Sequence, residues 1–191
     1  MAVESLPFTP DEDANRLLAT DPLALMLGML LDQQVSMEWA FQAPALLKQR
    51  LGGSLDAAAI AARPEAELEA TFREKPALHR YPASMAKRTH ALCGFLVEHY
   101  DGRAEAVWAG VEQGDELLRR CRELPGFGPE KSRIFVGLLG KRLGVRPNGW
   151  ETAAADWPSI ADVDSPERLA EVRAQKRAMK AAKRAAAAPE A

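Results

Sequence analysis

Nine consecutive residues, from Leu23 to Leu31, are apolar or glycine, and no other feature constrains the fold of this chain as strongly. Asp21 and Pro22 precede the run, and these residue types favour the N-cap and the first turn of a helix. We therefore expect a helix from Pro22 through Gln33 that is apolar nearly all round. Such a helix must be surrounded by other elements, while its apolar run is too short to cross a membrane. The run predicts a central core helix.

The rest of the chain follows helical spacing between prolines and glycines, without runs of alternating β-branched and polar residues. The predicted fold class is all-α. We expect one helical domain over residues 1–184 and a flexible tail over 185–191. Further helices are expected at about residues 38–50, 54–62, 64–75, 82–99, 115–123, 129–143 and 166–184, with a helix start at 148–151.

The net charge of −2 hides an asymmetry, because residues 122–146 and 167–191 together carry +8 and the remainder therefore −10. A nucleic acid would meet a basic patch on an acidic body, although solvated helix faces would explain the same charges. The two cysteines, Cys93 and Cys121, are too few for a disulfide framework, a four-cysteine zinc site or a cysteine-ligated cluster within this chain. The acidic N-terminus lacks a secretory signal. We expect a soluble, cytoplasmic monomer without a membrane contact or a side-chain metal site, associated with the nucleoid if it binds DNA.

The segment most informative about function runs from Leu124 to Ser132 and reads LPGFGPEKS. Gly126 and Gly128 permit a tight hairpin, and the proline after them suits the first turn of a second helix. The amides at that helix start are unpaired and carry the positive end of the helix dipole, so they can hold a phosphate. Lys131 and Ser132 would add a charge and a hydroxyl. The alternative is a hairpin with a purely structural role.

This string between two helices resembles the helix-hairpin-helix (HhH-GPD) DNA glycosylases of base-excision repair, in a short form without an iron–sulfur cluster. Residues 21–36 resemble the family's buried helix and glutamine-bearing turn, and residues 79–87 its loop with an intercalating side chain. The helix ending at Gly102 resembles the approach to the hairpin. The resemblance covers residues 20–148 and implies a two-lobed helical fold, double-stranded DNA as partner, and no cofactor beyond a monovalent cation at the hairpin.

An enzyme that acts on a base inside a duplex needs a phosphate anchor, a plug for the vacated stack and a pocket for the flipped base. Gln33 and Gln34 suit the mouth of the pocket; they could also cap the C-terminal end of the core helix, and the two roles can coexist. Arg80 and Tyr81 are candidate plugs, although Tyr81 could equally pack on the surface. The full set of expected DNA-binding residues is Gly126, Phe127, Gly128, Lys131, Ser132, Gln33, Gln34, Arg80, Tyr81 and Lys87.

The catalytic carboxylate is less evident. The resemblance places an aspartate near Asn148, which cannot stabilise positive charge on the sugar as an aspartate does. The candidates, in order, are Glu38, Asp32, Glu151 and Asp156. Glu38 is expected in an apolar cleft beside Trp39, which would raise its pKa; Glu38 and Asp32 could instead serve helix ends.

The hairpin position that carries a lysine in bifunctional family members reads Glu130, so a lyase step is not expected. Trp150 and Trp157 are interpreted as packing anchors for the C-terminal helix rather than as base-stacking platforms, and the histidines at 79, 90 and 99 as ordinary surface or loop residues. The predicted function is a monofunctional DNA glycosylase. A catalytically silent lesion-binding protein on the same fold and a helical protein-interaction module are the alternatives, and the identity of the excised base stays open.

Overall fold

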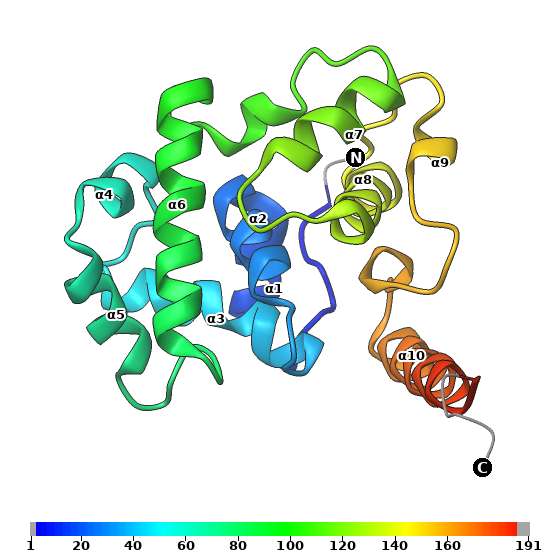
Figure 1. Ribbon diagram of the computed structural model, residues 1–191, viewed down its shortest axis with the longest axis horizontal. Coiled ribbons are helices and arrows are strands. Elements are labelled where there is room, and N and C mark those ends of the chain that lie inside the picture. Colours follow the sequence, from blue (N-terminus) through cyan, green and yellow to red (C-terminus); the bar gives the residue numbers. More distant parts are fainter. Residues whose placement is uncertain (1–2, 187–191) are drawn as a thin grey trace.

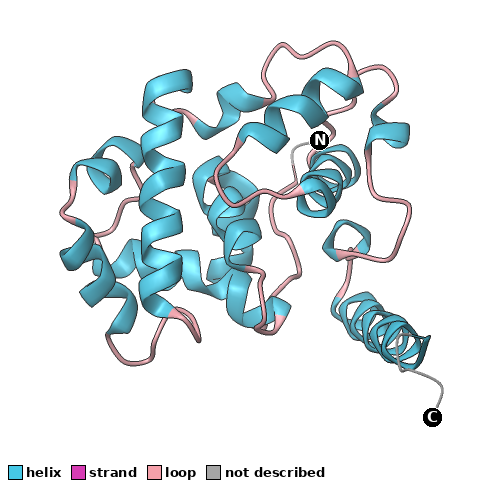
Figure 2. Ribbon diagram, viewed as in Figure 1, coloured by secondary structure: helices cyan, strands magenta, loops and turns pink. Residues whose placement is uncertain are grey.

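A computed structural model describes residues 3–186, and this part of the chain contains helices and loops but no strand, which confirms the all-α class (Figure 2). The α-helices are α1 (Glu12–Thr20), α2 (Pro22–Leu31), α3 (Met37–Arg50), α4 (Ala57–Ala62), α5 (Glu65–Arg73), α6 (Pro82–Tyr100), α7 (Gly114–Glu123), α8 (Pro129–Arg142), α9 (Trp150–Ala153) and α10 (Pro166–Ala186). Two 3-10 helices, η1 (Ala104–Val107) and η2 (Ile160–Asp162), complete them.

The α2 helix lies at the centre, with α4 to α6 on one side and α7 to α9 on the other (Figure 1). Asp21 caps it by accepting hydrogen bonds from the amides of Leu23 and Ala24. Every residue from Leu23 to Leu31 is buried, so the predicted core helix is confirmed, although it ends two residues before Gln33.

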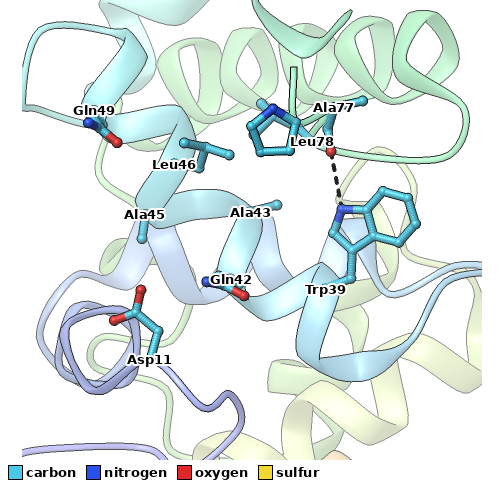
Figure 3. A pocket seen from close by; sticks show the side chains of 10 residues that line it. Asp11, Trp39, Gln42, Ala43, Ala45, Leu46, Gln49, Ala77 and Leu78 are labelled. Atoms are coloured by element: carbon cyan, nitrogen blue, oxygen red, sulfur yellow. Dashed lines mark hydrogen bonds between the residues drawn. The ribbon is translucent and has the colours of Figure 1, made fainter. Parts of the chain in front are cut away.

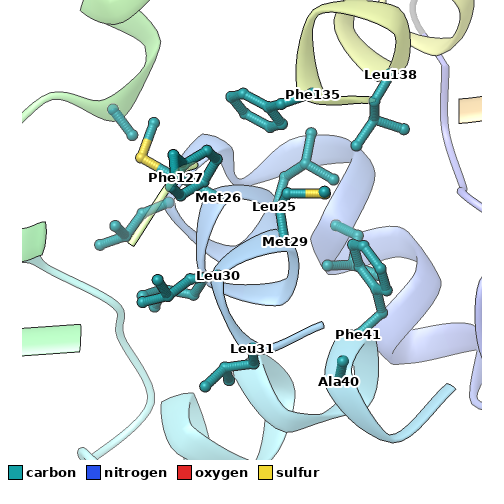
Figure 4. Close-up of a cluster of buried hydrophobic side chains, with 14 of the residues drawn as sticks. Leu25, Met26, Met29, Leu30, Leu31, Ala40, Phe41, Phe127, Phe135 and Leu138 are labelled. Carbon is teal, nitrogen blue, oxygen red and sulfur yellow. The ribbon is translucent and has the colours of Figure 1, made fainter. Parts of the chain in front are cut away.

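The packing around α2 uses aromatic rings from both sides (Figure 4). Phe127 and Phe135 approach from the hairpin and α8, and Phe41 approaches from α3. A Cβ at Gly28 would lie 2.6 Å from the Phe41 ring, so this glycine lets α3 approach α2 closely. The hairpin and α3 are thereby positioned around the same central helix.

The element boundaries follow the capping residues. The α4 helix begins at Ala57 rather than Ser54, because the Asp56 side chain accepts the amide of Ala59. The predicted helix start near Trp150 is a single turn, and α1 was not predicted. The α10 helix continues to Ala186, and residues 187–191 of the expected tail lie outside the described residues.

Among residues 3–186 no single helix is long and apolar enough to cross a membrane. The α1 and α2 helices together reach that length and composition, but they form an angle of 113° at the break between them.

Candidate nucleic-acid interface

The turn between α7 and α8 lies directly on α2. Gly126 has φ +85°, and a Cβ there would be 2.4 Å from Cδ1 of Leu30. Gly128, the N-cap of α8, has an extended backbone and open space where a Cβ would be. No side chain caps α8, so its first amides have no side-chain acceptor.

Two side chains of the hairpin segment are buried and cannot contact a nucleic acid. Phe127 is 4% exposed and packs edge-on against Phe135, with the ring centroids 5.4 Å apart. Ser132 is 0% exposed, and its hydroxyl donates to the carbonyl of Gly128 at 3.0 Å. The predicted contact between the Ser132 hydroxyl and a phosphate is therefore wrong, and Phe127 can contribute only through its backbone.

The ammonium of Lys131 also lies inside. It donates to the carbonyl oxygens of Met29 at 2.7 Å and Leu30 at 2.8 Å, which end α2 without helical partners. Burial lowers the pKa of Lys131 to about 8, and the nearby Asp32 carboxylate opposes this shift. The prediction that Lys131 neutralises a phosphate is corrected: its side chain fastens the hairpin to α2.

Gln33 takes the capping role that was one of its two predicted roles. Its amide nitrogen donates to the Leu30 carbonyl at 2.8 Å, and its amide oxygen accepts from Arg88 at 2.6 Å. Gln34 has φ +57°, and its side-chain oxygen lies 3.5 Å from the Tyr81 hydroxyl. The turn after α2 is thus joined to α6 through Arg88, a residue that carried no recognisable signal in the sequence.

His79 contacts the turn after α2 from the interior of the protein. It is 1% exposed; Nε2 donates to the Gln33 carbonyl at 3.0 Å, and Nδ1 accepts the Tyr81 amide at 3.0 Å. Burial lowers the pKa of His79 from its ordinary value of 6.5. His79 lies in a loop, as predicted, but it is not an ordinary loop residue, because it is buried and both ring nitrogens are engaged in the interior.

The plug candidates lie beside His79. Tyr81 is 41% exposed, and the Arg80 guanidinium lies 5.4 Å from its ring centroid. The Tyr81 and His79 ring centroids are 6.1 Å apart, and Trp39 continues the row at 6.3 Å from His79. The exposed Tyr81 ring therefore lies next to the turn that contains Gln34, on a loop whose backbone is held by His79.

A basic groove, hereafter the α10 groove, lies where α10 passes the segment between α2 and α3. Its volume is about 540 Å³, and its lining residues are Asp32, Val35, Ser36, Met37, Arg173, Lys176, Arg177 and Lys180. Four cationic side chains and one carboxylate thus line the same groove, and one of the four, Arg173, also pairs with Glu38. The sequence indicates a basic helix at this end of the chain. The residues that face this helix lie about 140 positions earlier, and no sequence pattern predicts that the two segments meet.

The two preferred carboxylates both contact α10. The Asp32 side chain is 14% exposed and lies 4.0 Å from Nζ of Lys176. Glu38 pairs through one oxygen with Arg173, and its other oxygen is buried without a hydrogen-bond partner. Glu38 lines a different cavity, of about 620 Å³, against the N-terminal segment. Only Asp32 belongs to the α10 groove.

The expected apolar cleft around Glu38 and Trp39 is absent from the described residues, because the two side chains face different cavities. The Trp39 indole donates to the Ala77 carbonyl at 3.2 Å and lines a cavity of about 380 Å³ with Gln42 and Gln49 (Figure 3). No lysine or arginine lines that cavity. It does not suit a polyanion.

Glu151 lies away from the groove. Its neighbour Trp150 packs on Gly140, which is 11 residues after Pro129 and thus about 16 Å along α8 from the hairpin. Asn148 is exposed, and its backbone pairs with the segment before α7. The structure therefore does not bring Glu151 together with the other candidate acids.

Two other predicted residues have different neighbours. The Asp156 side chain is 84% exposed and 3.9 Å from Arg133. Lys87 is exposed and lines a small cavity between α5 and α6 with Glu65 and Glu69. Lys87 is therefore outside the α10 groove.

Within residues 3–186 no group of three or more histidine, cysteine or acidic side chains could hold a metal ion. Burial raises the pKa values of Cys93 and Cys121 to about 12, so neither thiol is a reactive nucleophile. The sequence was compared with models of known protein families and with curated proteins, and neither comparison produced a match.

Proposed function

We propose that this protein binds duplex DNA through the α10 groove and the hairpin, and that it is a monofunctional DNA glycosylase with Asp32 as its charge-stabilising carboxylate. The observation that carries the proposal is the lining of the groove, which combines four cationic side chains with one mostly buried carboxylate, and Lys176 lies 4.0 Å from that carboxylate. The resemblance to helix-hairpin-helix glycosylases supplies the reaction class.

The phosphate contacts would come from two adjoining elements. Lys176 and Lys180 of α10 also line a cavity with Glu130, so the basic row lies beside the first turn of α8. The uncapped amides of α8 and the cations of α10 can therefore contact neighbouring phosphates of one strand. Such contacts fix the position of the DNA without reading its sequence.

Asp32 is suited to the chemical step. As the N-glycosidic bond breaks, its electron pair leaves with the base and positive charge develops at the sugar carbon, which a nearby carboxylate stabilises. Water then adds to that carbon and gives a proton to the carboxylate, which balances the proton that the departing base takes up. The Lys131 amine is engaged with Met29 and Leu30, so a Schiff-base step does not belong to the proposal.

Tyr81 and Arg80 would fill the space that the base leaves. The ring is exposed, and its backbone amide is held by the buried His79, so the loop is positioned before DNA arrives. An aromatic side chain of this kind stacks on bases without sequence preference.

The binding part of the proposal is tested by fluorescence anisotropy with a labelled duplex over a range of salt concentrations. The wild-type protein should lose affinity steeply with salt, and the double variant Lys176→Gln/Lys180→Gln should reduce the slope by about two phosphate contacts. The matched control is Lys48→Gln/Lys75→Gln, which removes the same charge outside the groove. Binding that is absent or independent of salt would overturn the proposal and favour a protein-interaction module.

A catalytically silent lesion-binding protein is the second candidate. The asparagine at position 148 favours it, since the resemblance places the catalytic aspartate near this position. Tight binding to lesion-bearing duplexes without excision of any base would identify this function.

A further inference from the structure

A second cavity, hereafter the Trp157 cavity, adjoins the α10 groove. Its volume is about 390 Å³, and its lining residues are Glu130, Trp157, Pro158, Lys176, Met179 and Lys180. Lys176 and Lys180 line both cavities. The two spaces therefore share one pair of cations, with Asp32 in the first and an indole ring in the second.

The indole ring of Trp157 is held in place before any ligand binds. The Arg133 guanidinium lies 5.2 Å from the ring centroid, and it donates to the Ala154 carbonyl at 3.1 and 2.7 Å. Arg133 is also 3.9 Å from a carboxylate oxygen of Asp156. Because these contacts hold the guanidinium, its cation–π contact favours the observed position of the ring.

The chemistry of the lining suits a nucleotide. Trp157, Pro158 and the 49% exposed Met179 offer an apolar surface for a flat ring. Lys176 and Lys180 offer positive charge for a phosphate, while the Glu130 carboxylate disfavours a bare anion and can accept a hydrogen bond from a base edge. A base that carries its phosphate matches all three features together.

We infer that the Trp157 cavity takes an unpaired base of the strand bound in the α10 groove. The base stacks on Trp157, and its phosphate lies against Lys176 and Lys180. This inference rests on the proposed DNA binding, and it adds a preference for DNA in which a base is already free of its partner.

The test compares the affinity for a blunt duplex with that for the same duplex extended by a three-base overhang. Wild-type protein should prefer the overhang by roughly tenfold, the usual size of one base-stacking contact. Trp157→Leu should abolish the preference, Trp157→Phe should retain most of it, and all three proteins should bind the blunt duplex equally.

The outcomes separate this inference from the proposed function. Salt-dependent binding without an overhang preference, or a preference that Trp157→Leu retains, would overturn the inference alone. Absence of binding to either duplex would overturn the proposed function as well.

If the thermal melt shows that Trp157→Leu fails to fold, a second measurement tests the inference on wild-type protein alone. An overhang that carries 5-iodouracil is photocrosslinked to wild-type protein, and the attached peptide is identified by mass spectrometry. Attachment at Trp157 is expected, and attachment elsewhere on the chain would overturn the inference.

Discussion

The ammonium of Lys131 lies 2.7 Å from the carbonyl oxygen of Met29, across 102 residues of sequence. This contact, together with its neighbour to Leu30, connects the first turn of α8 to the last turn of the core helix. Open carbonyls at a buried helix end need donors, and Lys131 supplies two. The hairpin is thus held by the core, and the first amides of α8 have no side-chain acceptor.

Stability should depend on pH through Lys131. Its folded-state pKa of about 8 lies below the ordinary value of 10.5, so between these pH values the unfolded chain binds more protons at this site. Stability contributed by this site therefore rises with pH in that window, and it is constant below pH 8. In urea unfolding, the free energy of unfolding of wild-type protein minus that of Lys131→Met should increase from pH 8 to 10. A constant or decreasing difference would contradict the burial of the ammonium.

The two hairpin glycines should respond differently to alanine. Gly126→Ala meets a positive φ and the Leu30 side chain, so we expect it to lower the unfolding free energy by about 1–3 kcal/mol. Gly128→Ala meets open space at a negative φ, so the unfolding free energy should change by less than about 0.5 kcal/mol. Its methyl group would lie at the uncapped start of α8, and duplex affinity should fall several-fold. Equal effects of the two substitutions on stability would contradict the packing of the turn.

Acid should weaken the fold through His79. The pKa of this buried histidine is below 6.5, so between the two values the unfolded chain takes up a proton that the folded protein does not. Stability is therefore lost as the pH falls through 6.5 toward the folded pKa. The loss should be smaller in His79→Gln when unfolding is followed between pH 7.5 and 5. The matched control is His99→Gln, which removes a histidine with a 48% exposed side chain and should retain the wild-type loss.

The helical class, the core helix and the hairpin could be predicted because their signals are local. An N-cap aspartate, a first-turn proline and glycines at the turn act over a few residues, and all have those roles in the structure. Gly126 is the clearest case, since the string from Leu124 to Gly128 between two predicted helices indicates a tight turn, and Gly126 has the positive φ that such a turn uses.

The side-chain roles could not be predicted in the same way. Their place at a helix start predicts that Lys131 and Ser132 add a charge and a hydroxyl to a bound phosphate. Their partners in the structure are instead the carbonyl groups of Met29, Leu30 and Gly128. Burial of a polar side chain depends on which distant backbone groups need a donor, and that requires the tertiary arrangement. The burial of His79 could not be predicted for the same reason, since its partners are backbone groups of Gln33 and Tyr81.

The α10 groove could be predicted only in part. The positive charge of the last helix was visible in the sequence, whereas its placement beside Asp32 depends on contacts between residues 32 and 176. Among the four candidate acids we propose Asp32, which lines the groove, whereas Glu38 lines another cavity. Glu151 lies toward the far end of α8, and the Asp156 side chain is 84% exposed.

The most direct test of the account is excision by wild-type protein and Asp32→Asn on a panel of labelled duplexes, each with one damaged or mismatched base, resolved after hot alkali. The account predicts alkali-dependent cleavage of at least one duplex by the wild type, and a loss of at least about 100-fold in Asp32→Asn. The variant should still bind the duplex, because its substitution removes a negative charge from the basic groove. Full activity in Asp32→Asn, or no cleavage of any duplex by the wild type, would contradict the account.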